Sequence, residues 1–441
     1  MKLYDNWNTS GTDLDQFRVA MKEIDDKTVM IQANTAELSL LREGYESGNV
    51  KNMSLVTYDS VKELNDTMFL ETANKRIPLD RLDKKLVAET LGGAGFFLVY
   101  KGTAYYMSDR AMGSLLDRAN LSGDAMFRRS VARDAMLVEG LYKSGIGERA
   151  NGMHDAKNKK GSANCTLVVR KEVENGNVYR KIFYVPSEKY CPVPMQFLAE
   201  IAEKICDDDK MGEPEVRYWY ADHGMSEIVI AFPEKGKELK DAYGLKDAVI
   251  PGVLIRSSDT GKSCVEVKGV AFIEGKTRYM TLEAAKRRHY GDIDEGKILD
   301  EANELILRNY RVLPELLAKL IGVPVSDFDL SKAAGVRKNA SRITNIVRKL
   351  MKGIKLTNII GKKKEMAIRD LIITELNPEI PYTLYDIALA VMSLGDRING
   401  VSSIMRDSIA AACTDVPYLL IKMVEEENID EIYLGEDEAS C

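Results

Sequence analysis

The chain has 441 residues, of which 45% are hydrophobic and 29% charged, which is enough for a buried core and excludes a wholly disordered protein. At this length two or three domains are expected. The formal net charge is -6 at pH 7, so any strongly basic stretch is a local exception in an acidic molecule.

The first fifteen residues contain no apolar run that could serve as a signal peptide, and no later stretch approaches the length of a membrane span. A cytoplasmic protein is therefore expected. The cysteines stand singly, without a CxxC pair, so neither a disulfide framework nor a zinc site is predicted. Reduced thiols are expected at all six positions, which are Cys165, Cys191, Cys206, Cys264, Cys413 and Cys441.

The N-terminal part of the chain is predicted to be helical and irregular, with helices in "LDQFRVAMKEI" and "LDRLDKKLVAETL". From Gly92 the sequence becomes β-rich, and Lys101-Gly102 predicts a hairpin between two short strands. Ser108 and Ser122 are predicted to cap the two helices that follow. The stretch 144–164, rich in Gly, Asn and Lys, is predicted to be an exposed loop.

Alternating apolar runs then meet at three tight turns, which implies antiparallel pairing. The turns lie around Asn175-Gly176, Asp222 to Gly224 and Asp259 to Gly261. Apolar stripes at helical spacing replace the strands after about Asp294. Four regions are predicted: 1–90 helical or irregular, 91–293 β-rich, 294–424 helical, and 425–441 an acidic tail. The predicted fold class is α+β, with a central antiparallel β-rich region, flanking helices and a helical C-terminal third.

A positive block precedes residue 365. Eleven basic residues and no acidic residue lie between Ser331 and Lys364. At about 100° per residue, the apolar residues from Ile343 to Ile354 fall on one side of a helix and the cations on the other. Close like charges on one face repel by a few tenths of a kcal/mol per pair, and an external polyanion would relieve this repulsion. The candidate nucleic-acid-binding residues are Lys338, Arg342, Arg348, Lys349, Lys352, Lys355, Lys362, Lys363 and Lys364.

Several partners fit this block. DNA or RNA is one, because each phosphate contacted releases condensed counterions and gives affinity without base recognition. The acidic tail is a second, either as a fixed structural pairing or as a mimic that nucleic acid displaces. A membrane surface also suits a basic amphipathic helix, although no membrane contact is predicted. The remaining alternative is a helix face that only meets solvent.

The run Tyr218-Trp219-Tyr220 could form a stacking platform for bases, because aromatic faces on a strand accept bases of any sequence. Alternation places Tyr218 and Tyr220 on one face and Trp219 on the other, and one of these faces is expected to be core. Ordinary sheet packing is therefore the alternative for this run.

"SDTGKS", residues 258–263, ends like a phosphate-binding loop. Arg256 stands where the first glycine of that motif belongs, and a strand-like segment follows instead of a helix. A hairpin turn is predicted here. The three histidines, His154, His223 and His289, have no metal-binding spacing. No catalytic residue, no cofactor and no metal site is predicted, although a metal-dependent nuclease or nucleotidyl enzyme is not excluded.

Three segments carry a resemblance: "YYMSDRAMGSLLDRANLSG" (105–123), "PGVLIRSSDTGKSCVEV" (251–267) and "PYTLYDIALAVMSLGDRI" (381–398). In order and spacing they resemble the phage and plasmid protein family that carries domain of unknown function nine-three-two. The chain departs from the family pattern at 389–392, which read Leu-Ala-Val-Met, and at 270–273, which read Val-Ala-Phe-Ile. The family has no agreed activity and no catalytic residues. The resemblance implies a protein of a bacteriophage or plasmid, encoded near DNA replication and recombination functions and acting in the bacterial cytoplasm.

The predicted function is a non-enzymatic nucleic-acid-binding accessory protein that contacts the backbone of single-stranded DNA, in replication, recombination or annealing. The alternative is an assembly factor whose basic face docks on an acidic surface of a host or phage protein. A homo-oligomer is compatible with either function.

Overall fold

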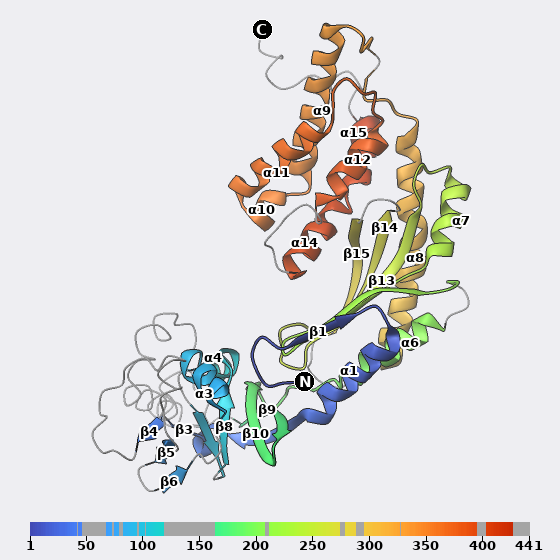
Figure 1. The fold of residues 1–441 in the computed structure, drawn as a ribbon. Coiled ribbons are helices and arrows are strands. Elements are labelled where there is room, and N and C mark those ends of the chain that lie inside the picture. Colours follow the sequence, from blue (N-terminus) through green and yellow to red (C-terminus); the bar gives the residue numbers. More distant parts are fainter. Residues whose placement is uncertain are drawn as a thin grey trace, which may run out of the picture.

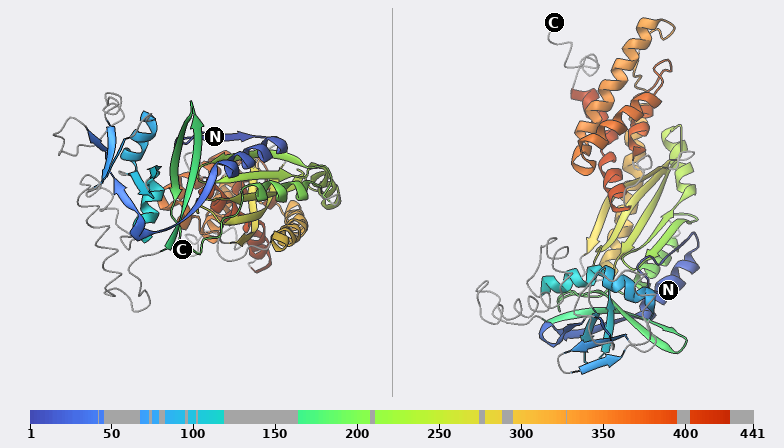
Figure 2. Two further views of the ribbon diagram at one scale, coloured as in Figure 1. Left: turned by 90° about the horizontal axis from the view of Figure 1, so that it is seen from below. Right: turned by 60° about the vertical axis from the view of Figure 1, so that its left-hand side comes forward.

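The computed structural model describes residues 1–41, 43–45, 68–72, 75–78, 83–94, 97–101, 103–118, 164–207, 211–273, 278–287, 295–326, 328–394 and 403–426. The molecule is elongated: C-terminal helices gather at one end, a sheet with the helices of residues 84–118 lies at the other, and a second sheet lies between them (Figures 1 and 2). The predicted α+β class, with helices in the C-terminal third, is confirmed.

The sheet in the middle, called the central sheet, has six strands in the order β1-β11-β12-β13-β14-β15, and all neighbours are antiparallel. The predicted hairpins at Asp222 to Gly224 and Asp259 to Gly261 join β11 to β12 and β13 to β14. The bounds are β1 (Asn8–Gly11), β11 (Glu215–Asp222), β12 (Ser226–Ala231), β13 (Val249–Ser257), β14 (Val265–Ile273) and β15 (Arg278–Arg287).

The sheet at the end of the molecule, called the end sheet, has the order β2-β9-β10-β8-β7-β3. The hairpins at Asn175-Gly176 and at Lys101 are present, but β8 and β10 pair in parallel, which the sequence did not indicate. A small sheet of β4 (Glu43–Tyr45), β5 (Met68–Thr72) and β6 (Lys75–Pro78) completes the β structure described. The bounds in the end sheet are β2 (Thr28–Asn34), β3 (Ser39–Leu41), β7 (Phe97–Tyr100), β8 (Thr103–Met107), β9 (Asn164–Glu174) and β10 (Asn177–Tyr184).

The prediction of a helical and irregular N-terminal region was incomplete. Helices α1 (Leu14–Lys27) and α3 (Lys84–Gly92) are present, with a short 3-10 helix η1 (Thr35–Glu37), but six strands also lie in this part of the chain. β1 joins the edge of the central sheet and β2 joins the end sheet, with α1 between them. The segment "NTSG" of β1 has no apolar alternation because it is an edge strand, so periodicity did not reveal it.

Helices α1 and α6 (Gln196–Cys206) cover one face of the central sheet. Phe17 and Met21 of α1 pack with Ile201 of α6 and with Ile228 and Val253 of the sheet, all buried. Two further helices, α4 (Asp109–Arg118) and α7 (Pro233–Tyr243), lie against the end sheet and the central sheet, respectively. The Oγ atom of Ser108 accepts a hydrogen bond from Ala111 N at 3.1 Å, so the predicted cap of α4 is confirmed.

Helix α8 (Glu295–Ile321) runs along the central sheet into the C-terminal bundle (Figure 1). Its Leu313 and Leu317 belong to one buried cluster with Val249 and Ile273 of the sheet. Helix α12 (Leu384–Met392) ends at Ser393 and α14 is Ser403–Cys413, whereas residues 395–402 lie outside the described residues. The other helices are α9 (Ala333–Gly353), α10 (Leu356–Ile360), α11 (Lys362–Glu375) and α15 (Val416–Glu426).

Three predicted features fall outside the described residues: the helix that begins at Ser122, the loop 144–164 except its last residue, and the acidic tail beyond Glu426. Within the described part of the chain, no helix combines the length and the apolar character needed to cross a lipid bilayer.

Candidate nucleic-acid interface

Helix α9 has the two faces that the sequence predicts. Ile343, Ile346, Val347, Leu350 and Met351 are buried in the core of the C-terminal bundle. The opposite face carries cations, several of them one helical turn apart. This arrangement follows from apolar residues that recur every three or four positions.

Seven of the nine candidate residues are exposed, and none of the seven forms an ion pair with a carboxylate of the described residues. Arg348 and Lys352 are four positions apart, so their like charges repel on the helix surface. We call this set the basic face, and it comprises Lys338, Arg348, Lys352, Lys355, Lys362, Lys363 and Lys364.

Two sharp backbone turns place the last three lysines beside α9. Lys355 has φ 52° and Gly361 has φ 81°, so the chain reverses on either side of the single-turn helix α10. Helix α11 then packs back on α9. Lys362, Lys363 and Lys364 form the first turn of α11, where the helix dipole and the free N–H groups are also positive. The positive end of the helix dipole repels these three cations, and an anion bound there would offset the repulsion.

Arg342 differs from its neighbours because it is half-buried and contacts the chain itself. Its guanidinium lies 4.0 Å from the ring centroid of Phe328, and Nη1 donates to the carbonyl of Val325 at 3.2 Å. Lys338 lies over the same ring, at 5.3 Å. Lys349 is also half-buried and has a contact of its own. Arg342 therefore holds the segment between α8 and α9 against α9.

Replacing Arg342 by glutamine is expected to lower the free energy of unfolding by about 1–2 kcal/mol, because the cation–π contact and a charged hydrogen bond are lost. Thermal and urea unfolding measure this change. Arg348→Gln is the matched control on the exposed face, and its effect should stay within about 0.5 kcal/mol. Equal losses of stability for the two variants would contradict the structural role of Arg342.

Trp219 lies on one face of β11, and Tyr218 and Tyr220 lie on the other, as alternation along a strand requires. The three rings therefore do not form one stacking platform. Trp219 is only 3% exposed, and its ring centroid lies 5.8 Å from that of Phe17 in the core under α1. Tyr218 is 36% exposed, and Tyr220 OH donates to Asp222 at 3.1 Å. Burial and the Asp222 carboxylate raise the pKa of Tyr220 to about 12. Trp219 is thus removed from a base-stacking role, and β11 lies far from the basic face (Figure 1).

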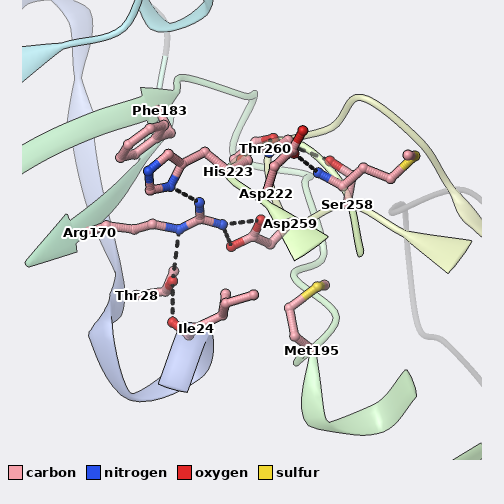
Figure 3. A network of polar contacts seen from close by, with 12 residues as sticks. Ile24, Thr28, Arg170, Phe183, Met195, Asp222, His223, Ser258, Asp259 and Thr260 are labelled. Carbon is pink, nitrogen blue, oxygen red and sulfur yellow. Dashed lines mark hydrogen bonds and ion pairs between the residues drawn. The ribbon is translucent and has the colours of Figure 1, made fainter. Parts of the chain in front are cut away.

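The loop 258–263 is a hairpin turn, as predicted, and it is also the buried junction between the two large sheets (Figure 3). Ser258, Asp259 and Thr260 are at most 4% exposed. The carbonyl of Thr260 accepts from Arg110 Nε at 2.8 Å, and that of Asp259 accepts from Tyr190 OH at 2.7 Å. These bonds join the loop to α4 and to the segment that follows β10.

At the centre of this junction Arg170 of β9 makes a buried ion pair with Asp259. The pair is bidentate, with Nη2 at 2.7 and 2.8 Å from the two carboxylate oxygens. Nη1 of Arg170 lies 2.6 Å from Nδ1 of His223, whose ring stacks on Phe183 at 4.2 Å (Figure 3). Burial, and then the nearby Arg170 and Lys181 cations, lower the pKa of His223 to about 2. The imidazole is therefore neutral at physiological pH and accepts from Arg170.

The sequence did not point to this junction. Arg170, His223 and Asp259 lie on three different turns or strands, separated by 53 and 89 positions from Arg170. The sequence predicted only a hairpin turn at 258–263, where the ending Gly-Lys-Ser is like that of a phosphate-binding loop. The network joins β9 to two turns of the central sheet, so its role is structural, and Nε2 of His223 is buried there without a hydrogen-bond partner among the described residues.

No group of three or more His, Cys, Asp or Glu side chains among the described residues is placed to hold a metal ion. His154, His289 and Cys441 lie outside the described residues. The other five cysteines form no disulfide with one another, and burial raises the pKa of Cys413 to about 12.

No family model, no curated protein and no solved structure matches the chain. The resemblance to the phage and plasmid family therefore stays a prediction.

Proposed function

We propose that the chain is a nucleic-acid-binding accessory protein and that the basic face on α9, α10 and α11 contacts the phosphate backbone. The observation that carries the proposal is a set of seven exposed cations without a carboxylate partner among the described residues, in a chain of net charge -6. Phosphates would neutralise like charges that now repel one another. Single-stranded DNA of a phage or plasmid is the proposed ligand, because the family resemblance implies that context.

The anchoring of the cations supports the same function. Ile346, Val347 and Leu350 hold one side of α9 in the core, so the charges on the other side project from a rigid element. The first turn of α11 adds unpaired N–H groups and a positive dipole next to its lysines. None of these contacts depends on base identity, so binding should be independent of sequence.

Binding of a labelled oligonucleotide should weaken steeply with salt. If about five phosphates are neutralised, the slope of log affinity against log salt should be roughly -3.5 to -4.5, with single strands at the shallow end. Replacing Arg348, Lys352 and Lys355 by glutamine should reduce the steepness by about 2, because each lost phosphate contact removes about 0.7 for a single strand. Fluorescence anisotropy at several salt concentrations measures both slopes.

The matched control replaces three exposed lysines elsewhere by glutamine, namely Lys22, Lys189 and Lys237. It removes the same charge but no residue of the basic face, so its slope should equal that of the wild type. An unchanged slope in the first triple variant, or equal losses in both, would remove the basic face from the site.

A second candidate function is docking on an acidic protein. It is favoured by Met366 and Leu371 of α11, which are 42% and 44% exposed next to the lysines. Apolar and cationic groups together are typical of protein interfaces. Failure of the full chain to bind any oligonucleotide at low salt would favour this candidate. Binding that appears only after deletion of residues 427–441 would instead identify the acidic tail as a displaceable mimic.

A further inference from the structure

A cavity distant from the basic face lies between α1, β1 and β11. Its volume is about 430 Å³, within the range of small-molecule sites, and it is open to solvent. Its lining includes Trp7 and Trp219, which are the chain's only tryptophans. Trp7 is half-buried, and Val19 at the rim is 66% exposed. The cavity therefore combines indole rings with an exposed aliphatic side chain.

The charged side chains that line the cavity are all acidic. Two carboxylates, Asp15 and Glu23, belong to it, and no Lys, Arg or His does. Both carboxylates pair with cations, but only through one oxygen each: Asp15 Oδ1 with Arg18 at 2.8 Å, and Glu23 Oε1 with Lys27 at 2.8 Å and with the N-terminal ammonium group of Met1. Asp15 Oδ2 and Glu23 Oε2 have no partner among the described residues. Each carboxylate thus retains an oxygen that can accept a further hydrogen bond.

The indole rings also have unused capacity. No cation of the described residues lies over Trp7 or Trp219, whereas tyrosines and phenylalanines elsewhere in the chain have such neighbours. The ring of Trp7 contacts His223 instead, with centroids 5.1 Å apart. The N–H of Trp219 is buried in the wall beside Gly11 and has no acceptor among the described residues. Because Trp219 is almost fully buried, the half-buried indole of Trp7 is the one that a cation from outside the chain can reach.

We propose that this cavity binds an organic cation that has a planar or compact head and a short apolar stem, such as an alkylguanidinium or alkylammonium group. The indole of Trp7 provides a cation–π contact, the free oxygens of Asp15 and Glu23 accept hydrogen bonds from the head, and Val19 packs on the stem. Two carboxylates without a lining cation exclude phosphate. This site is thus independent of the basic face, and the proposal does not depend on nucleic-acid binding.

Tryptophan emission is a direct measure of this binding, because both tryptophans line the cavity. The probes are n-butylguanidinium and n-butylurea, which have nearly the same shape but differ in charge. Saturable quenching by butylguanidinium is expected at roughly millimolar concentration, as suits a partly exposed cation–π site. Butylurea should bind at least roughly tenfold more weakly. The absence of saturable quenching, or equal binding of the two probes, would overturn the proposal.

Removing the charges of the two carboxylates tests where the head of the bound cation lies. The double variant Asp15→Asn/Glu23→Gln should bind butylguanidinium roughly tenfold more weakly than the wild type, because both acceptors lose their charge. Asp26→Asn is the matched control: Asp26 is an exposed acid on the same helix and does not line the cavity. If the double variant unfolds, Asp15→Asn alone suffices, since this side chain is 79% exposed and its loss should leave the fold intact. Undiminished binding in the charge-removed variant would also overturn the proposal.

The natural source of the cation is either a free small molecule or an arginine or lysine side chain of a peptide. A blocked Gly-Arg-Gly tripeptide distinguishes them under the same conditions. Tighter binding of the tripeptide than of butylguanidinium would identify a peptide source, and weaker binding would identify a free small cation.

Discussion

Replacing Asp259 by asparagine is expected to lower the free energy of unfolding by about 3–5 kcal/mol, because the change leaves the charge of Arg170 buried without a counter-ion. Arg170 is 1% exposed and both of its bonds to a carboxylate go to Asp259. The chain cannot hydrate this guanidinium without separating the two sheets. Urea unfolding followed by circular dichroism measures the loss.

Asp370→Asn is the matched control. Asp370 pairs with Arg369 at 3.1 Å, but its side chain is 64% exposed, so the same substitution should cost less than about 1 kcal/mol. A double variant, Arg170→Met/Asp259→Leu, tests the cause, because it removes both charges and fills a similar volume. It should be more stable than Asp259→Asn by roughly 2 kcal/mol. A double variant as unstable as the single one would show that lost contacts, and not the unpaired charge, hold the junction together.

Lowering the pH from 7 to 5 is expected to destabilise the protein by about 2 kcal/mol through His223 alone. The pKa of this group is about 2 in the folded chain and 6.5 without the fold. Between these values the unfolded chain binds a proton that the folded chain does not, so stability is complete above pH 6.5 and falls as the pH decreases. For each pH unit below 6.5, the free energy of unfolding falls by about 1.4 kcal/mol.

His223→Asn tests this origin, because the amide oxygen can accept from Arg170 as Nδ1 does but cannot take up a proton. The variant should lose most of the difference between unfolding free energies measured at pH 7 and pH 5. An equal difference in wild type and variant would assign the pH dependence to other groups.

The sequence predicted those parts of the fold that depend on neighbouring residues. Asn175-Gly176 provides a turn with positive φ at both positions, and the hairpin β9–β10 forms there. The apolar stripe from Ile343 to Met351 likewise placed the buried side of α9 correctly. In both cases the signal is a short-range pattern that tertiary contacts reinforce.

Parts that depend on distant partners were not predictable. Alternation separated Trp219 from Tyr218, but only Phe17, about two hundred positions earlier, decides which side is core. Arg342 looked equivalent to Arg348 in the sequence, and Phe328 distinguishes them in space. The polar residues of the turn 258–260 are buried because Arg170 of the end sheet and Arg110 of α4 supply their partners. No pattern within the turn contains that information.

The pairing of β1 with β11 has a consequence for the order of folding. Asn8 lies opposite Asp222, so β1 is synthesised about two hundred residues before the strand with which it pairs. The hairpins from β11 to β15 can close locally and early, whereas the N-terminal strand can only be added last, as an edge. Until then its backbone groups are unpaired, which makes this strand the point at which slow assembly exposes the chain to aggregation.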